Sequence, residues 1–242
     1  MSEQAYAAPN MHTHELKARP RRLVDGSPAT ALALAGACLL ALAVIWVIAQ
    51  LVPAAHTKDA VILNEFVSFN RPRLESLGNF LLHLLNPSLF ILWGFALVAV
   101  AVAREQPRVA VAVVAVLCLA PLTADILKPL LAHSHAQIGY VQIGAASWPS
   151  GHSTAASALA LSAVLVSPPS IRTAVATLGA LFVLAVGGAL LMLAWHMPSD
   201  VVGGWFVATF WMALAVAALR AAERRRPTGV AQREPGSPPA VS

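Results

Sequence analysis

Residues 148–153 read Trp-Pro-Ser-Gly-His-Ser and stand directly before an apolar run, so they mark the start of a helix. A Pro-Ser-Gly turn at a helix start leaves the backbone N–H groups of Gly151 and His152 without partners inside the helix. Those donors and the positive end of the helix dipole form a site for an anion. Ser150 suits the N-cap position, and His152 adds a side chain that exchanges protons near neutral pH.

A second polar stretch, residues 195–200, reads Trp-His-Met-Pro-Ser-Asp and again precedes an apolar run. It places the imidazole of His196 four residues before the carboxylate of Asp200. Two histidines, one carboxylate and an anion-binding turn together favour chemistry on a phosphate group.

The composition predicts an integral membrane protein. The chain has 242 residues, of which 58% are hydrophobic and 11% charged, and its mean hydropathy is +0.70. Soluble proteins carry about 25% charged residues. The net charge of +5 does not indicate a nucleic-acid partner, because the basic residues gather in short flanks beside apolar runs.

The predicted fold class is an all-α integral membrane protein, a six-transmembrane-helix bundle with an interfacial amphipathic segment. The amphipathic segment is residues 53–79, where charged residues alternate with apolar ones at helical spacing. The Asn86-Pro87 pair is predicted to kink the second span. The six predicted spans are approximately residues 29–52, 80–103, 109–131, 151–166, 173–194 and 198–219.

The predicted domain organisation is one membrane domain, residues 29–220, between two disordered cytoplasmic tails. The first tail, residues 1–28, is basic, and the second, residues 221–242, is rich in Arg, Pro and Gly.

The basic residues predict a multi-pass protein of the cytoplasmic membrane with both termini in the cytoplasm. With six spans, only Lys58, Arg71 and Arg73 fall in an outer loop. Both histidine-bearing stretches then face outside. The basic residues placed inside are Lys17, Arg19, Arg21, Arg22, Arg104, Arg108, Arg172, Arg220, Arg224, Arg225, Arg226 and Arg233.

Lys128 lies near the outer end of the third predicted span. A charge inside a membrane span is costly and is usually functional. A structural alternative is that Lys128 extends to the interface, or pairs with Asp125 three residues earlier on the same helix face.

Lys128, then Pro149-Ser150-Gly151-His152, then His196-x-x-x-Asp200 occur in an order that resembles the type-2 phosphatidic acid phosphatase superfamily. The resemblance covers roughly residues 60–215. It implies a six-helix membrane bundle that removes phosphate from lipid phosphates or diphosphates without a metal or other cofactor. The implied partners are a lipid phosphate substrate and the membrane lipids.

The resemblance also implies a role for each matching residue. His196 would attack phosphorus and become a phosphohistidine, while Asp200 would hold the other ring nitrogen. His152 would protonate the leaving alkoxide and later help to activate water. The phosphoryl oxygens would be held by Lys128, Ser150 and Gly151.

Two arginines of the family pattern are missing. The family has Arg-Pro where this chain has His135 and Ala136, and it has Ser-Arg where this chain has Ala189 and Leu190. No guanidinium replaces their forked hydrogen bonds to phosphate. His135, with His133, is therefore predicted to contribute to phosphate binding.

Several functions remain open from the sequence. The favoured one is hydrolysis of a lipid phosphate at the outer membrane face, and the alternative is a catalytically weak relative that binds a lipid phosphate or a protein. A metal site at His133, His135, His152 and His196 is less favoured, because the family spacing explains the last two histidines without a metal. A vanadate-dependent haloperoxidase shares the motif order but needs more cationic residues. The particular lipid and the oligomeric state are not predicted.

Overall fold

The computed structural model describes residues 26–134 and 143–225, and within these ranges all regular structure is helical. Every α-helix begins at a proline except α6, which begins at Gly151. Proline suits the first helical position because its φ is fixed and its missing N–H would be unpaired there anyway. The elements are α1 (Pro28–Trp46), the π-helical turn η1 (Val47–Leu51), α2 (Pro53–Ser68), α3 (Pro72–His83), α4 (Pro87–Ala103), α5 (Pro107–Leu130), α6 (Gly151–Val166), α7 (Pro169–Met192) and α8 (Pro198–Arg224).

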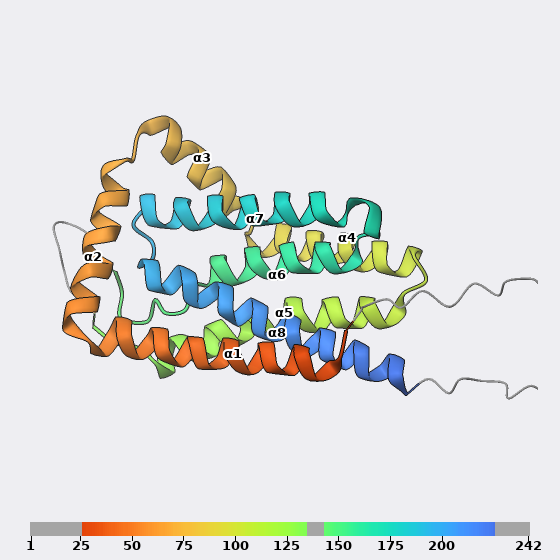
Figure 1. Cartoon of the computed structure of the whole chain (residues 1–242). Helices are drawn as coiled ribbons and strands as arrows, with labels where there is room; N and C mark the ends of the chain where they lie inside the picture. Colours follow the sequence, from red (N-terminus) through yellow and green to blue (C-terminus); the bar gives the residue numbers. More distant parts are fainter. Residues whose placement is uncertain (1–25, 135–142, 226–242) are drawn as a thin grey trace, which may run out of the picture.

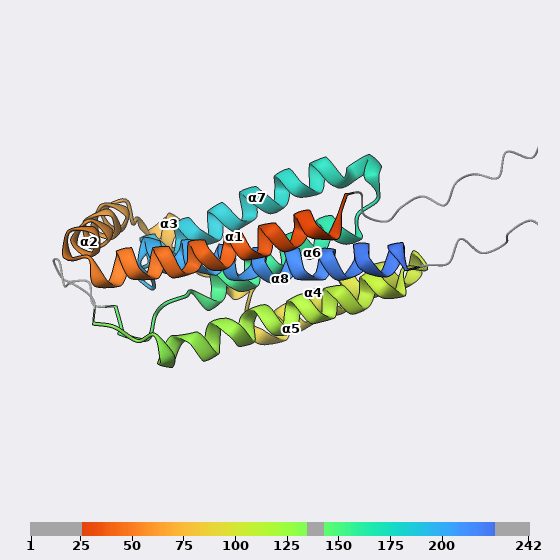
Figure 2. The same cartoon turned by 60° about the horizontal axis from the view of Figure 1, so that its bottom comes forward.

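The long helices run alongside one another, and α2 crosses one end of the bundle (Figure 1). The start of α1 and the end of α8 lie together at the opposite end, where Arg220 Nη1 donates to the carbonyl of Ser27 at 3.1 Å. α6 packs against α5, α7 and α8, so it lies inside the bundle (Figure 2). The chain therefore leaves the bundle at the end where it entered.

Four segments are long and apolar enough to cross a membrane: α1 with η1, α5, α7 and α8. α3 and α4 would form a fifth span together, although their axes are bent by 57°. α6 has 16 residues and is about 24 Å long, shorter than a hydrocarbon core of about 30 Å. The chain is a multi-pass membrane protein that is all-helical in its described residues, and the six-span count stays a prediction.

The outward surface of the bundle is apolar. Leu40, Phe95, Val111 and Leu178 each expose two thirds or more of their side chains. Alanine is the commonest buried apolar residue, followed by leucine and valine, and the small alanine side chains let membrane helices approach closely. An apolar exterior around a core of small side chains is the pattern expected of helices surrounded by lipid.

The second predicted span differs from the structure, because Asn86-Pro87 ends one helix and starts another and does not kink a continuous one. Asn86 is extended at ψ 148°, the conformation that a following proline favours, and Pro87 begins α4. Trp93 Nε1 donates to the carbonyl of Leu84 at 3.2 Å across this bend.

The predicted ends of the last two spans also shift. α7 begins at Pro169, not near residue 173, and α8 continues to Arg224, past the predicted end at 219. Residues 221–224 read Ala-Ala-Glu-Arg and are good helix formers, so they extend α8. The other residues of the two predicted tails lie almost entirely outside the described ranges.

The predicted amphipathic segment is helical and forms α2 and the first part of α3. Ala60 and Leu63 of α2 are buried against the bundle. Val61, Ile62 and Phe66 are exposed together with Lys58 and Glu65, so the outer face of α2 carries both apolar and charged side chains. Such a face suits the membrane interface, and that location remains a prediction.

Candidate active site

The two histidine-bearing stretches meet at the end of the bundle that α2 crosses (Figure 1). The backbone N–H of Ser150 donates to the carbonyl of Asp200 at 2.9 Å. Ser153 Oγ donates to the carbonyl of Val201 at 2.7 Å. These bonds join the first turns of α6 and α8, which are about fifty residues apart in the sequence, and so bring the two predicted motifs together.

Close contact between α6 and α8 depends on Gly204. A Cβ at Gly204 would lie 2.7 Å from the carbonyl oxygen of Ser150 and 2.9 Å from both Ser153 Cβ and the backbone nitrogen of Thr154. No side chain fits there without a backbone shift. Gly204 therefore sets the distance between the starts of the two helices.

Ser150 is the N-cap of α6, as predicted. Its Oγ accepts the backbone N–H of Ser153 at 3.3 Å, and its carbonyl accepts the hydroxyl of Thr154 at 2.8 Å. Ser150 has no exposed surface. Gly151 and His152 occupy the first two positions of the helix, where N–H groups have no intrahelical partner and the helix dipole favours an anion.

Lys128 reaches this turn from the last turn of α5. Its Nζ lies 3.2 Å from the position that a Cβ at Gly151 would occupy. The same Nζ donates to Asp125 Oδ1 at 2.8 Å, and Asp125 is 66% exposed. The structural alternative, a pair with Asp125, is therefore confirmed. The ammonium also lies beside the start of α6, and its role in phosphate binding stays a prediction.

His196 and Asp200 form the predicted pair. His196 Nδ1 lies 3.3 Å from Asp200 Oδ2, and the same oxygen accepts the backbone N–H of Met197 at 3.0 Å. Asp200 is completely buried, whereas the His196 side chain keeps 13% of its surface exposed. Because Asp200 occupies Nδ1, the ring nitrogen left for chemistry is Nε2.

His152 faces the same region. Its ring packs edge-on against Trp195, with 5.6 Å between ring centroids and an interplanar angle of 71°. His196 and Lys128 are both near enough to act on His152 electrostatically. The two predicted catalytic imidazoles and the predicted phosphate-binding lysine therefore share one site.

The loop histidines are only partly described. His133 donates its backbone N–H to the carbonyl of Ala145 at 3.0 Å, and its ring lies 6.4 Å from that of His56 on α2. His135 lies outside the described residues. Within the described ranges, no three His, Cys, Asp or Glu side chains are grouped as a metal ion would need. Three of the four hypothesised metal ligands, His133, His152 and His196, lie in these ranges, so the metal hypothesis gains no support from the structure.

The positions of the missing Ser-Arg pair are buried in the apolar core. Ala189 is 1% exposed and Leu190 has no exposed surface. A charge at position 190 would lie among packed aliphatic side chains.

Sequence reasoning missed two residues at this site. One is Gly204, for which the only signal was the Gly-Gly pair shortly after Asp200. The other is Asp59 on α2, whose carboxylate accepts both the hydroxyl and the backbone N–H of Ser199, at 2.6 Å and 3.2 Å. Ser199 is 140 residues from Asp59 in the sequence, so no local sequence pattern predicted this contact.

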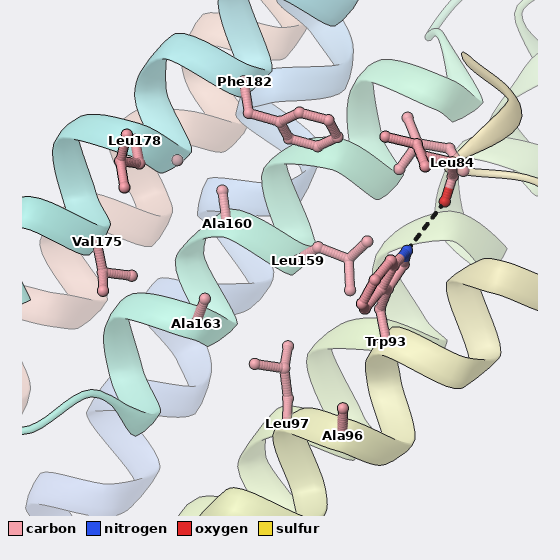
Figure 3. Close-up of a pocket in the computed structure, with 12 residues that line it drawn as sticks. Leu84, Trp93, Ala96, Leu97, Leu159, Ala160, Ala163, Val175, Leu178 and Phe182 are labelled. Carbon is pink, nitrogen blue, oxygen red and sulfur yellow. Dashed lines mark hydrogen bonds between the residues drawn. The ribbon is translucent and has the colours of Figure 1, made fainter. Parts of the chain in front are cut away.

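An apolar pocket of about 400 Å³ opens between α4, α6 and α7 (Figure 3). Its lining includes Leu97 of α4, Leu159 and Ala163 of α6, and Leu178 and Phe182 of α7. Leu159 lies two turns after His152, about 10 Å along the helix axis. One helix therefore connects the candidate site with an open apolar pocket further along the bundle.

A family model described as the PAP2 superfamily matches residues 108–224. The structure is also similar to the crystal structure of the first transmembrane PAP2 type phosphatidylglycerolphosphate phosphatase from Bacillus subtilis, with a TM-score of 0.64 and 17% sequence identity. The match covers 81% of this chain and 98% of that chain. A likeness at this identity concerns the fold. No curated protein matches the chain.

Proposed function

We propose that this membrane protein, of which residues 108–224 match the PAP2 superfamily model, is a phosphatase that hydrolyses a lipid phosphate at the outer face of the cytoplasmic membrane through a phosphohistidine intermediate. The observation that carries the proposal is the contact between the two motifs. The bond from the Ser150 N–H to the Asp200 carbonyl sets the His196–Asp200 pair beside the anion-binding start of α6. These contacts support the assignment of nucleophile, orienting carboxylate and phosphate site to neighbouring residues.

The proposed reaction has two steps. Nε2 of His196 forms a bond to phosphorus as the bond to the lipid oxygen breaks, and His152 gives that oxygen a proton. Asp200 at Nδ1 stabilises the positive charge that develops on the ring. A water molecule then gives a proton to His152 and its oxygen to phosphorus, the P–N bond breaks, and phosphate leaves.

The phosphoryl oxygens are proposed to bind Lys128 and the first turn of α6. Lys128 Nζ lies beside Gly151, and the N–H groups of Gly151 and His152 are the first two of α6, so both kinds of donor are available at that turn. Ser150, completely buried, would act on the phosphate by shaping the turn. His135 remains proposed as a further phosphate contact.

An apolar tail on the substrate is supported by the pocket of Figure 3. Its volume of about 400 Å³ lies within the usual range for ligand pockets, roughly 300–1,000 Å³. We expect Ala163→Phe to fill part of it and to raise KM for a long-chain lipid phosphate, with little change for a short-chain ester. Equal effects on both substrates would remove the pocket from the proposal.

The orientation rests on where the basic residues lie. Arg104, Arg108, Arg172, Arg220 and Arg224 all lie at the end of the bundle away from α2. Short cytoplasmic loops are enriched in such residues. Both termini would then be cytoplasmic and the site would face outside.

Cysteine labelling tests this orientation. In a Cys38→Ala, Cys118→Ala background, Ala145→Cys marks the exposed loop at the site end and Ser170→Cys marks the opposite end. An impermeant thiol reagent added to intact cells should label only position 145. Labelling of position 170 alone would reverse the orientation.

The activity test is phosphate release by the purified protein across a panel of lipid phosphates and diphosphates. His196→Ala should abolish release, and His152→Ala should slow poor leaving groups much more than good ones. Wild-type rates in both variants would contradict the proposed roles. Chelators should have no effect, whereas a loss of activity reversed by zinc would revive the metal hypothesis.

A second candidate function is a catalytically weak relative that binds a lipid phosphate or a protein. The observation that favours it is the buried Leu190, which stands where the family has an arginine. Binding of lipid phosphate by a wild type that hydrolyses no member of the panel would support it.

In an active enzyme, His135→Arg should raise the rate at alkaline pH, because a guanidinium keeps its charge where an imidazole, with an ordinary pKa near ~6.5, does not.

A further inference from the structure

α2 contributes one acidic side chain to the candidate active site. Asp59 Oδ2 accepts the hydroxyl of Ser199 at 2.6 Å, and its Oδ1 accepts the backbone N–H of the same residue at 3.2 Å. Both carboxylate oxygens therefore hold one residue. That residue lies between His196 and Asp200 in the sequence, in the first turn of α8.

The segment from His196 to Asp200 is held from two sides. From within, Asp200 Oδ2 accepts the N–H of Met197 and lies 3.3 Å from His196 Nδ1. From outside, Asp59 fixes Ser199. Since Pro198 has no N–H, Ser199 supplies the first backbone donor of α8, and Asp59 occupies it.

From these contacts we infer that Asp59 is a positioning residue for the phosphatase: through Ser199 it holds the first turn of α8, and so keeps Asp200 and His196 in their reactive arrangement. The inference rests on the proposed function. It also gives α2, which lies outside the matched residues 108–224, a part in the reaction.

The charge of Asp59 is costly to the folded state. Burial raises the pKa of its carboxyl, the hydrogen bonds from Ser199 lower it, the charge of Asp200 raises it and His56 lowers it, with a net rise. The other two elements that pack on α2 bring no titratable side chain here: η1 has none, and the only one of α7, Arg172, lies at its far end.

The direction of this pKa shift predicts that Asp59→Asn affects stability and reaction rate differently. A carboxyl with a raised pKa stabilises the folded state most when it is protonated, and that contribution is lost as pH rises through the folded pKa. At neutral pH the neutral amide in Asp59→Asn should therefore leave the melting temperature unchanged or raise it. The amide offers only one acceptor oxygen to the two donors of Ser199, so it should hold the first turn of α8 less firmly. The variant should thus keep its stability and lose rate.

The test compares Asp59→Asn, Asp59→Ala, Ser199→Ala and the Asp59→Ala/Ser199→Ala double variant in the full-length protein. Asp59→Ala should lower kcat by about 10- to 100-fold, the scale of a small misplacement of reacting groups, with KM within about twofold. The double variant should lose no more than Asp59→Ala, because both changes break the same contact. Asp59→Asn should show a smaller loss of kcat.

Glu65→Ala is the matched control, because Glu65 is an exposed acid on the same helix and should behave as wild type. Wild-type kcat in Asp59→Ala would overturn the inference, as would a loss of kcat that only follows a loss of melting temperature. If the wild type hydrolyses nothing, the proposed function fails while hydrogen exchange still tests the contact. The amides of Met197 and of residues 199–201 should then exchange several-fold faster in Asp59→Ala than in Glu65→Ala, and equal rates would overturn the inference.

Discussion

The starts of α6 and α8 lie side by side, and a histidine stands at each. They differ in whether the first backbone N–H groups of the helix are occupied by an acceptor. α6 begins with Gly151, which keeps its N–H, and Ser150 caps only the N–H of Ser153. α8 begins with Pro198, which has none, and its next N–H is taken by Asp59. One helix start is open to an anion, and the other is already occupied by a carboxylate.

This difference separates the charges that the proposed reaction needs. The open start of α6, with Lys128 beside it, favours the negative phosphate. At the start of α8, Asp200 Oδ2 lies 3.3 Å from His196 Nδ1 and would stabilise the positive charge that develops on the ring during the proposed attack, while Asp59 occupies the backbone N–H of Ser199. Two neighbouring helix starts of the same kind thus acquire opposite electrostatic preferences from the residues that cap them.

The largest effect is expected from removing the negative charge of Asp200 at the start of α8. Asp200→Asn keeps the shape of the side chain but removes the charge that stabilises the His196 ring, and its NH₂ group can turn toward Nδ1. By analogy with other carboxylate–histidine pairs, kcat should fall by about 100- to 10,000-fold, measured as phosphate release at saturating substrate. Binding of a non-hydrolysable phosphonate analogue should change little. A kcat within threefold of wild type would show that the charge at the start of α8 is not needed.

Separating the two starts should have the next largest effect. Gly204→Ala forces a Cβ against the backbone of α6 and should destabilise the protein by about 1–3 kcal/mol, with loss of activity even in the folded fraction. Gly188→Ala is the matched control, since a Cβ there meets nothing within 4 Å and the better helix propensity should stabilise by up to about 1 kcal/mol. Thermal unfolding in detergent measures both. Equal melting temperatures would contradict the close approach.

Removing the cation beside the open start of α6 should mainly weaken substrate binding. Lys128→Met removes the cation beside Gly151, and KM should rise by about 10- to 100-fold, the value of a charged hydrogen bond of roughly 1.5–3 kcal/mol. Asp125→Asn removes the partner of Lys128 and keeps the lysine, so KM should fall or stay unchanged. A rise of KM in both variants would mean that the ion pair, not the free ammonium, shapes the site.

The smallest effect is expected from removing the N-cap of α6. Ser150→Ala should cost about 1 kcal/mol of stability, as loss of an N-cap does. Ser27→Ala, which removes the equivalent cap of α1 from Thr30, provides the comparison. Because Ser150 is completely buried, KM should change by less than twofold in both. A larger rise of KM in Ser150→Ala alone would show that its hydroxyl contacts the phosphate.

The sequence predicted the helical membrane character and both polar helix starts, because hydropathy and capping are local properties. The apolar runs at residues 29–52, 109–131 and 198–219 correspond to α1 with η1, α5 and α8. The family resemblance also implied the pairing of His196 with Asp200, and both residues lie within one short segment. The Asn86-Pro87 pair predicted a kink in one helix, whereas it separates two helices with axes 57° apart.

Tertiary structure decided the rest, because it depends on contacts between residues far apart in the chain. Hydropathy and capping patterns carry no information on which helices touch, so neither the close approach at Gly204 nor the bond from Ser150 to Asp200 could be read from them. Asp59 belongs to the same class: on α2 it is one charged residue among several, and only the packing of α2 across the end of the bundle turns it toward Ser199. The sequence by itself determined which groups are available, and the fold determined which backbone donors remain open and which are occupied.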